Sequence, residues 1–196
     1  MKPYIAGEHE LFAGNHLVFR KLEYVDCNSV VRSWETVDRK GGSCRSGDGK
    51  AAAVIIIARI VPDDEILLIR QFRPPAGKLM IEFPAGLIDP GETPKQAAVR
   101  ELFEETGFDG KVLFTQSPSY SSPGMTGESV ILTVMEIDGS RYDQGLPEAH
   151  PEECEHIEVF RVKVAELAEF IAEQENAGCG IDSKIYTYLA MRRIGF

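Results

Sequence analysis

Three acidic side chains that could bind a metal ion, Glu101, Glu104 and Glu105, lie close together in the segment from Gly86 to Gly107. Residues spaced at i, i+3 and i+4 share one face of a helix, so the carboxylates would point the same way. Like charges at this spacing repel, and anions in the C-terminal half of a helix oppose its dipole. Taken alone, the glutamates would suit a solvated acidic face. A hard divalent cation such as Mg²⁺ explains their arrangement within the whole segment, because it binds carboxylate oxygens and leaves room for phosphate and water.

The helix that would carry these glutamates has clear boundaries in the sequence. Thr93 can act as N-cap, Pro94 suits the first helical position, and Gln96 completes a capping box. Gly107 can adopt the positive φ that often ends a helix. The sequence therefore predicts a helix over residues 94–106.

Other elements must position this helix. The run AAAVIIIARI at 51–60 is nearly all β-branched or small and apolar, as expected of a strand buried on both faces. An Asp-Cys-Asn turn at 26–28 indicates a hairpin near the N-terminus. We expect strands at 16–24, 29–38, 51–60, 65–73, 81–83, 111–116, 129–137 and 156–162, and further helices at 164–176 and 182–193. The fold class is α+β, with a mixed sheet flanked by helices and an N-terminal β-hairpin.

Length and charge limit the function classes. With 196 residues, the chain suggests one domain with a modest appendage, and the Gly- and Ser-rich segment 41–50 is the best candidate for a linker. The net charge of −10 disfavours binding along nucleic acid, which requires a basic surface. We find no signal peptide and no apolar run that could span a bilayer, so a cytoplasmic protein without a membrane partner is expected.

The four cysteines, at positions 27, 44, 154 and 179, form no CxxC pair and have no zinc-site spacing. We interpret them as ordinary reduced thiols. This agrees with the expected cytoplasmic location, where disulfides are rare.

The acidic segment resembles a known family signature. Gly86, five residues, Glu92, seven residues and then Arg100-Glu101-Leu102-x-Glu104-Glu105-x-Gly107-Phe108 resemble the Nudix box at every defined position. The resemblance implies an α/β/α sandwich, divalent-metal binding and hydrolysis of a nucleoside diphosphate linked to another moiety. By the same pattern, Glu92 and Arg100 form a salt bridge that fixes the loop to the helix.

The Nudix resemblance also assigns metal ligands. Glu101 and Glu105 would be the main ligands, Glu104 a further ligand or a positioning residue, and Ala85 would add its carbonyl oxygen. Arg100 can reach Glu104 at i+4 and hold it in place. Bound Mg²⁺, or Mn²⁺ as an alternative, would offset the charge of the diphosphate and lower the pKa of the attacking water.

Similarity beyond the box indicates a branch of the family. Residues 71–93, the segment Arg32–Arg39 and the loop Ser122–Thr126 resemble the ADP-ribose (ADP-sugar) pyrophosphatases, and the similarity covers roughly residues 14 to 190. The resemblance implies a homodimer that uses the N-terminal element. We therefore divide the chain into an N-terminal β-strand region at 1–45 and a Nudix domain at 46–196.

The branch resemblance implies a set of contacts to a nucleoside diphosphate sugar. Arginine suits the diphosphate because its planar fork matches phosphate oxygens. Without the resemblance, the tryptophan would suit core or dimer packing, and Arg73 could equally be a surface arginine. The implied contacts are Trp34 stacked on adenine, Glu35 hydrogen-bonded to it, Arg39 and Arg73 on the phosphates, and Gly124 and Met125 beside the terminal ribose.

The general base is expected in the loop 147–155. Alignment with the branch favours Glu155, while Glu152 and Glu153 are close alternatives. His150 could also act as a base by its chemical type, although a lone histidine beside proline is usually only exposed.

One departure from the branch leaves the substrate open. A second tryptophan can sandwich the adenine in that branch, and the ungapped alignment places His16 at its position. Hydrolysis of another nucleoside diphosphate sugar, such as GDP-mannose, is therefore the alternative. A non-catalytic sensing module or a protein that uses metal only for structure is less favoured, because every carboxylate of the box is present.

Overall fold

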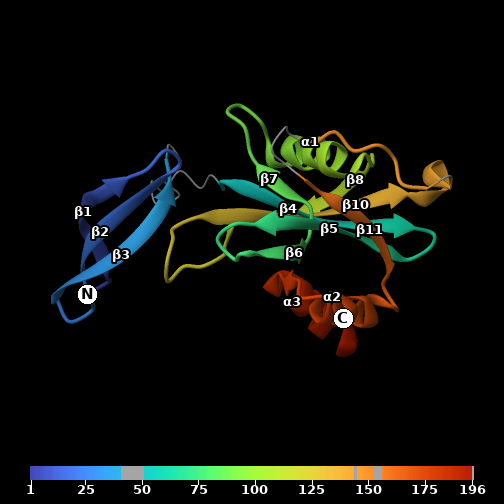
Figure 1. The fold of residues 1–196 in the computed structure, drawn as a ribbon. Coiled ribbons are helices and arrows are strands. Elements are labelled where there is room, and N and C mark those ends of the chain that lie inside the picture. Colours follow the sequence, from blue (N-terminus) through green and yellow to red (C-terminus); the bar gives the residue numbers. More distant parts are fainter. Residues whose placement is uncertain (41–50, 144, 152–155, 196) are drawn as a thin grey trace. The chain divides into compact units, whose positions relative to one another are not determined.

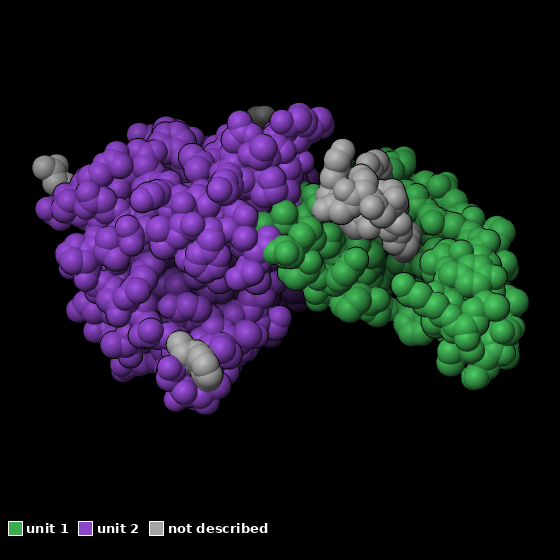
Figure 2. Space-filling view, turned by 180° about the vertical axis from the view of Figure 1, so that it is seen from behind, with its two compact units in different colours: residues 1–52, 117–131 green, residues 53–116, 132–196 purple. Residues whose placement is uncertain are grey.

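The computed structural model describes residues 1–40, 51–143, 145–151 and 156–195. The chain forms two compact units, one of residues 1–52 and 117–131 and the other of residues 53–116 and 132–196 (Figure 2). Residues 117–131 thus group with the N-terminal sheet. The division of the chain at residue 45 stays a prediction.

The first unit contains a three-stranded antiparallel sheet, ordered β1-β2-β3 (Figure 1). Its strands are β1 (Tyr4–Ala13), β2 (Leu17–Val25) and β3 (Val31–Arg39). The expected hairpin is confirmed, with Leu22 opposite Trp34. Strand β1 was not predicted, because nearly all its residues are exposed and the alternation that marks a half-buried strand is absent.

The turn between β2 and β3 is organised by Asp26. One oxygen of its carboxylate accepts the N–H groups of Asn28 and Val30, both at 2.9 Å, and the other accepts from Arg32 Nε. The hydrogen bond from Val30, followed by that from Arg32, lowers the pKa of Asp26. These contacts fix the register of the hairpin at its closed end.

The second sheet is mixed, as expected. Its main path runs β12-β6-β5-β4-β10-β8, while β11 pairs with β5, β7 with β4 and β9 with β10. Strand β6 pairs in parallel with β12 and antiparallel with β5. The strands are β4 (Ala53–Val61), β5 (Glu65–Arg73), β6 (Lys78–Glu82), β7 (Ala85–Leu87), β8 (Lys111–Thr115), β9 (Ser119–Tyr120), β10 (Ser129–Asp138), β11 (Glu158–Lys163) and β12 (Gly180–Ile181).

Helices cover both faces of this sheet in the second unit. Helix α1 (Pro94–Thr106) lies on one face, and α2 (Leu167–Asn176) and α3 (Ser183–Arg193) lie on the other (Figure 1). A short 3-10 helix, η2, spans Gly139–Tyr142. The predicted α/β/α sandwich and its three helices are confirmed.

The core of the second unit lies between these layers. Strands β4 and β5 supply apolar side chains with no exposed surface. Each helix contributes at least one fully buried anchor, and removing such a leucine typically costs about 2–5 kcal/mol. The helix anchors include Leu102, Leu167 and Ile185. Helix α1 is thereby held rigidly against the sheet.

Within the described residues, none of the helices combines the length and the apolar character needed to cross a bilayer.

Candidate active site

Helix α1 begins and ends where the sequence predicted. Thr93 Oγ1 accepts from the N–H of Gln96 at 3.3 Å, and Gln96 Oε1 accepts from the N–H of Thr93 at 2.9 Å, which completes the capping box. Gly107 adopts φ 74° and its N–H donates to the Phe103 carbonyl. Because both ends of the helix are fixed, the side of the helix on which each glutamate lies is fixed as well.

Glu105 lies on the buried side of α1. Glu105 is only 2% exposed, and its Oε2 accepts a hydrogen bond from the backbone N–H of Ala85 at 3.0 Å. A carboxylate this deeply buried needs hydrogen bonds or a cation to offset its desolvation. The contact therefore joins the C-terminal half of α1 to the start of β7.

Glu101 reaches the next residue of β7. A Cβ placed on Gly86 would lie 1.8 Å from the carboxylate carbon of Glu101 and 1.9 Å from its Oε1. Real Cβ atoms essentially never approach so closely, so any larger residue at position 86 would force this carboxylate to move. Glu101 and Glu105 thus both reach the Ala85–Gly86 segment.

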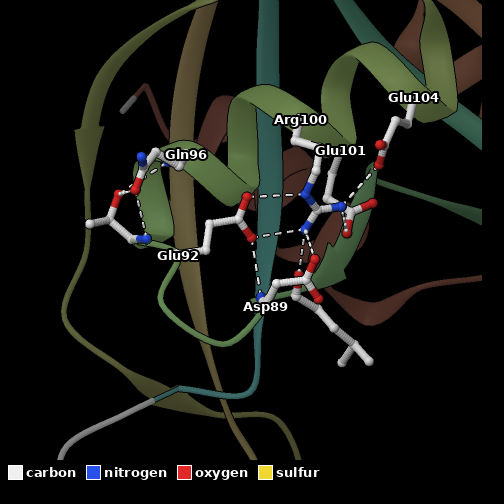
Figure 3. Close-up of polar contacts among 8 residues, drawn as sticks. Asp89, Glu92, Gln96, Arg100, Glu101 and Glu104 are labelled. Atoms are coloured by element: carbon white, nitrogen blue, oxygen red, sulfur yellow. Dashed lines mark hydrogen bonds and ion pairs between the residues drawn. The ribbon is translucent and has the colours of Figure 1, made fainter.

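A single guanidinium, that of Arg100, connects the acidic side chains (Figure 3). It forms a two-pronged pair with Glu92, with Nε to Oε1 at 3.0 Å and Nη2 to Oε2 at 2.9 Å. Its Nη1 donates to Glu101 Oε1 at 2.8 Å and to Glu104 Oε2 at 2.9 Å. Nη2 also donates to the Leu87 carbonyl at 2.9 Å. The expected Glu92–Arg100 salt bridge and the i+4 contact to Glu104 are confirmed.

This pairing has a clear electrostatic effect. Hydrogen bonding to Arg100 lowers the pKa of Glu92, while Glu92 is the largest cause of the raised pKa of Arg100. One positive charge is therefore shared among three carboxylates, so the group keeps a net negative charge that suits a cation.

The loop predicted to carry the general base is described as far as Pro151. The His150 N–H donates to the Glu104 carbonyl at 2.7 Å, and the His150 ring lies 5.4 Å from that of Phe103. A Cβ on Gly107 would lie 2.4 Å from the Glu148 carbonyl oxygen. Residues 148–150 therefore contact the C-terminal turn of α1. Glu155 and its alternatives Glu152 and Glu153 lie outside the described residues.

The carboxylates fit a divalent cation by chemistry and by direction. Glu105 and Glu101 approach neighbouring residues of β7, Ala85 and Gly86, and Glu104 reaches the same guanidinium as Glu101. Within the described ranges, no three acidic, histidine or cysteine side chains form a ready-made metal cluster. The donor set nevertheless matches the oxygen ligands that a hard cation prefers.

The first unit brings together Trp34, Gly124 and Met125, three of the residues expected to contact substrate. Trp34 is 50% exposed, and its Nε1 donates to the Gly124 carbonyl at 3.0 Å. The Met125 carbonyl accepts from Thr36 Oγ1 at 3.0 Å and from the Val37 N–H at 3.1 Å. An exposed aromatic ring thus lies beside a loop whose backbone is held by β3.

Arg39 and Glu35 lie on the same strand. Arg39 Nε donates to Glu128 Oε1 at 2.7 Å, while Glu35 is exposed. Sequence reasoning missed Glu128 and also the buried polar pair Thr36 and Asp38. Polar residues at alternate positions of a strand, as at 36 and 38, were the available signal.

Arg73 lies in the second unit, at the end of β5. It pairs with Glu82 on β6, with Nε to Oε2 at 3.0 Å and Nη2 to Oε2 at 2.8 Å. Gln71 Nε2 also donates to Glu82 Oε2 at 3.2 Å. Glu82 was not expected to take part. His16, in the first unit, is exposed, and its carbonyl accepts from the Lys40 N–H.

Comparisons with known proteins agree with this geometry. Residues 49–178 match the NUDIX domain family. The chain is 35% identical over 166 residues to the ADP-ribose pyrophosphatase of Saccharomyces cerevisiae, covering 85% of this chain and 72% of the relative. It is 31% identical over 191 residues to the ADP-sugar pyrophosphatase of Mus musculus, covering 95% and 86%.

A solved structure shares the fold. The crystal structure of an ADP compounds hydrolase superposes with a TM-score of 0.64 at 22% identity, covering 100% of this chain and 97% of that one. At this identity the likeness supports the fold alone.

Proposed function

The chain belongs to the Nudix hydrolase family, and from that premise we propose that it hydrolyses the diphosphate of ADP-ribose, or of a related ADP-sugar, to AMP and a sugar phosphate. The names of the yeast and mouse relatives support this substrate class. The observation that carries the proposal is the approach of Glu101 and Glu105 to one segment of β7, Ala85–Gly86.

Nudix hydrolases generally need a divalent metal, and we propose Mg²⁺, with Mn²⁺ as the alternative. Glu101 and Glu105 would hold it, with Glu104 and the Ala85 carbonyl as further ligands. A bound cation would offset the negative charge of the diphosphate and lower the pKa of the attacking water.

The chain's own residues have separate tasks in this proposal. Arg100 keeps Glu101 and Glu104 in one arrangement through paired hydrogen bonds. Glu155 would take the proton of the attacking water as general base, and Glu152 and Glu153 are the alternatives. Loss of this proton to a nearby base makes the water a stronger nucleophile at neutral pH.

Four residues of the first unit would orient the base and the terminal ribose of the substrate. Trp34, half exposed and held by the Gly124 carbonyl, would stack on the base, and Glu35 would hydrogen-bond it. The backbone of Gly124 and Met125 would line the terminal ribose.

The phosphates would be bound by Arg39 and Arg73. Each guanidinium is paired with a carboxylate, Arg39 with Glu128 and Arg73 with Glu82, and each side chain is still at least 44% exposed. Paired and exposed arginines are held in place while keeping donors for phosphate oxygens.

We also propose a cytoplasmic homodimer that binds no nucleic acid. The net charge of −10 supports the last point. Large apolar side chains on the three-stranded sheet support the dimer, because such groups usually gain a covering partner. The exposed side chains include Tyr4, Ile5, Leu11, Phe12, Val31 and Trp34.

Turnover of ADP-ribose by the purified protein, with and without Mg²⁺, tests the proposal. We expect magnesium-dependent release of AMP and ribose 5-phosphate. Cleavage of GDP-mannose in place of ADP-ribose would keep the chemistry and replace the substrate. Failure to cleave any nucleoside diphosphate sugar would overturn the enzymatic proposal.

A further inference from the structure

The loop of residues 122–128 lies along the free edge of β3, which is an edge strand of the three-stranded sheet. The loop forms its own turn, because the N–H groups of Met125 and Thr126 both donate to the Ser122 carbonyl, at 2.9 and 3.0 Å. An edge strand has backbone groups without a partner strand. Here the Met125 carbonyl takes up the N–H of Val37, so the loop partly replaces a neighbouring strand.

Side chains of β3 reinforce this contact in sequence order. Trp34 holds Gly124, Thr36 holds Met125, and Asp38 accepts the Gly127 N–H at 3.4 Å. Arg39 then reaches Glu128. The strand and the loop therefore run side by side through matched contacts rather than touching at one point.

Asp38 is the buried member of this series. It is 5% exposed, and its Oδ2 accepts from Arg20 Nη1 at 3.0 Å. Arg20 Nε lies 2.8 Å from Glu8 Oε1 on β1. A buried carboxylate is costly unless it is paired and hydrogen-bonded. Ion pairs from Glu8 to Arg20 and from Arg20 to Asp38 thus connect the three strands. Asp38 in turn connects them to the loop through the Gly127 N–H.

Thr36 is equally enclosed, at 4% exposure, and its hydroxyl donates to the same Met125 carbonyl that Val37 uses. A donor removed from this site would leave that carbonyl with fewer hydrogen bonds. In hydrogen bonding, threonine differs from valine only by its hydroxyl. Thr36→Val therefore isolates the contribution of the Thr36 hydroxyl.

We infer that Thr36 and Asp38 are positioning residues of the nucleotide site: they hold the 122–128 loop on β3, so that Trp34 and Arg39 on the strand and Gly124 and Met125 on the loop meet the substrate as one element. The inference rests on the proposed function. Neither residue is proposed to touch the substrate.

This role predicts a particular kinetic effect. The carboxylates of the chemical step lie on α1 in the second unit, whereas Thr36 and Asp38 shape only binding contacts in the first. Loss of binding contacts that act equally in the ground and transition states raises KM and leaves kcat unchanged. A general loss of folded protein would lower the active fraction and leave KM unaltered.

The test uses Thr36→Val and Asp38→Asn in the full chain, with Thr36→Ser as rescue. Matched controls are Thr133→Val, a buried threonine on β10, and Asp26→Asn at the far turn of the same sheet. KM and kcat for ADP-ribose are measured with Mg²⁺. Acrylamide quenching of nucleotide-free protein reports on Trp34 directly, because the chain has one tryptophan.

Thr36→Val and Asp38→Asn should raise KM roughly threefold to tenfold with kcat within about twofold, the range expected for one lost hydrogen bond. Both should make Trp34 easier to quench, while Thr36→Ser and the two controls should keep the KM, the kcat and the quenching of the unchanged protein. Unchanged KM and quenching in both variants, or a fall in kcat alone, would overturn the inference. If the unchanged protein cleaves no ADP-ribose, the proposed function fails instead, and quenching still decides whether the two residues hold the loop.

Discussion

Glu101 occupies the space that any side chain at residue 86 would need, since a Cβ on Gly86 would lie 1.8 Å from its carboxylate carbon. The requirement for glycine is therefore one of volume, set by an acidic side chain of helix α1. It ties the first residue of the Nudix box to the carboxylate that the resemblance assigns to the metal.

Gly86→Ala should remove most activity by displacing Glu101. We expect a loss of about 100-fold or more in kcat/KM, since small displacements of positioned catalytic groups have effects of that order. Mg²⁺-induced thermal stabilisation should fall in parallel. Gly14→Ala is a suitable control, because the added Cβ would lie 3.6 Å from its nearest neighbour. Full activity in Gly86→Ala would contradict the assigned position of Glu101.

Glu105→Gln should abolish most turnover with little change in fold. The amide oxygen can still accept the Ala85 N–H, whereas the charge needed for a cation is lost. We expect kcat/KM to fall roughly 100-fold or more, with an unchanged circular dichroism spectrum. Glu169→Gln, at an exposed position on α2, is the control. Retained activity would rule out Glu105 as a metal ligand.

The Glu92–Arg100 pair should make the stability of the protein depend on pH in the acid range. The pKa of Glu92 lies below its usual value of 4.5, chiefly because Arg100 hydrogen-bonds the charged form. Its stabilising effect is complete above the unfolded pKa, at about pH 5 and higher, and is lost as the pH falls through the lowered pKa. Thermal denaturation from pH 6 to 3 should show a smaller acid-induced loss for Glu92→Gln. Identical slopes would indicate that other groups dominate.

Thr133→Val should stabilise the protein. Among the residues that the structure describes, the Thr133 hydroxyl is the one buried side-chain polar atom without a hydrogen-bond partner, and the residue has no exposed surface. Replacing it by a methyl group removes that desolvation cost, worth about 1–2 kcal/mol. Urea denaturation should show a higher midpoint at constant slope. A lower midpoint would mean that the hydroxyl makes a contact in solution.

Light scattering should give a particle of twice the chain mass of 21.7 kDa at micromolar concentration. The apolar side chains exposed on β1, β2 and β3 are the physical reason. A monomer would remove the dimer proposal and any contribution of Trp34 or Arg39 to a neighbouring subunit's site.

The local features of the site could be predicted from the sequence. The capping box, the terminal glycine and the i+4 contact of Arg100 with Glu104 all depend on residues within a few positions of one another. Such contacts follow from helix geometry alone.

Contacts between distant segments could not be predicted in the same way. Glu82 and Glu128 pair with arginines that belong to other elements, and Glu128 lies 89 positions from its partner Arg39. Nothing in the local pattern indicates which carboxylate a given arginine meets. Strand β1 was missed for another reason, because a strand without a buried face has no apolar alternation. Glu155 as general base stays a prediction.

The 122–128 loop has a second consequence through the edge of β3. Unpaired N–H and C=O groups on an edge strand can template pairing with another polypeptide, the first step of edge-to-edge aggregation. By accepting the N–H of Val37 and hydrogen-bonding Thr36 and Asp38, the loop blocks that pairing along the C-terminal half of the strand. The contacts proposed to shape a nucleotide site therefore also contribute to the colloidal stability of the protein.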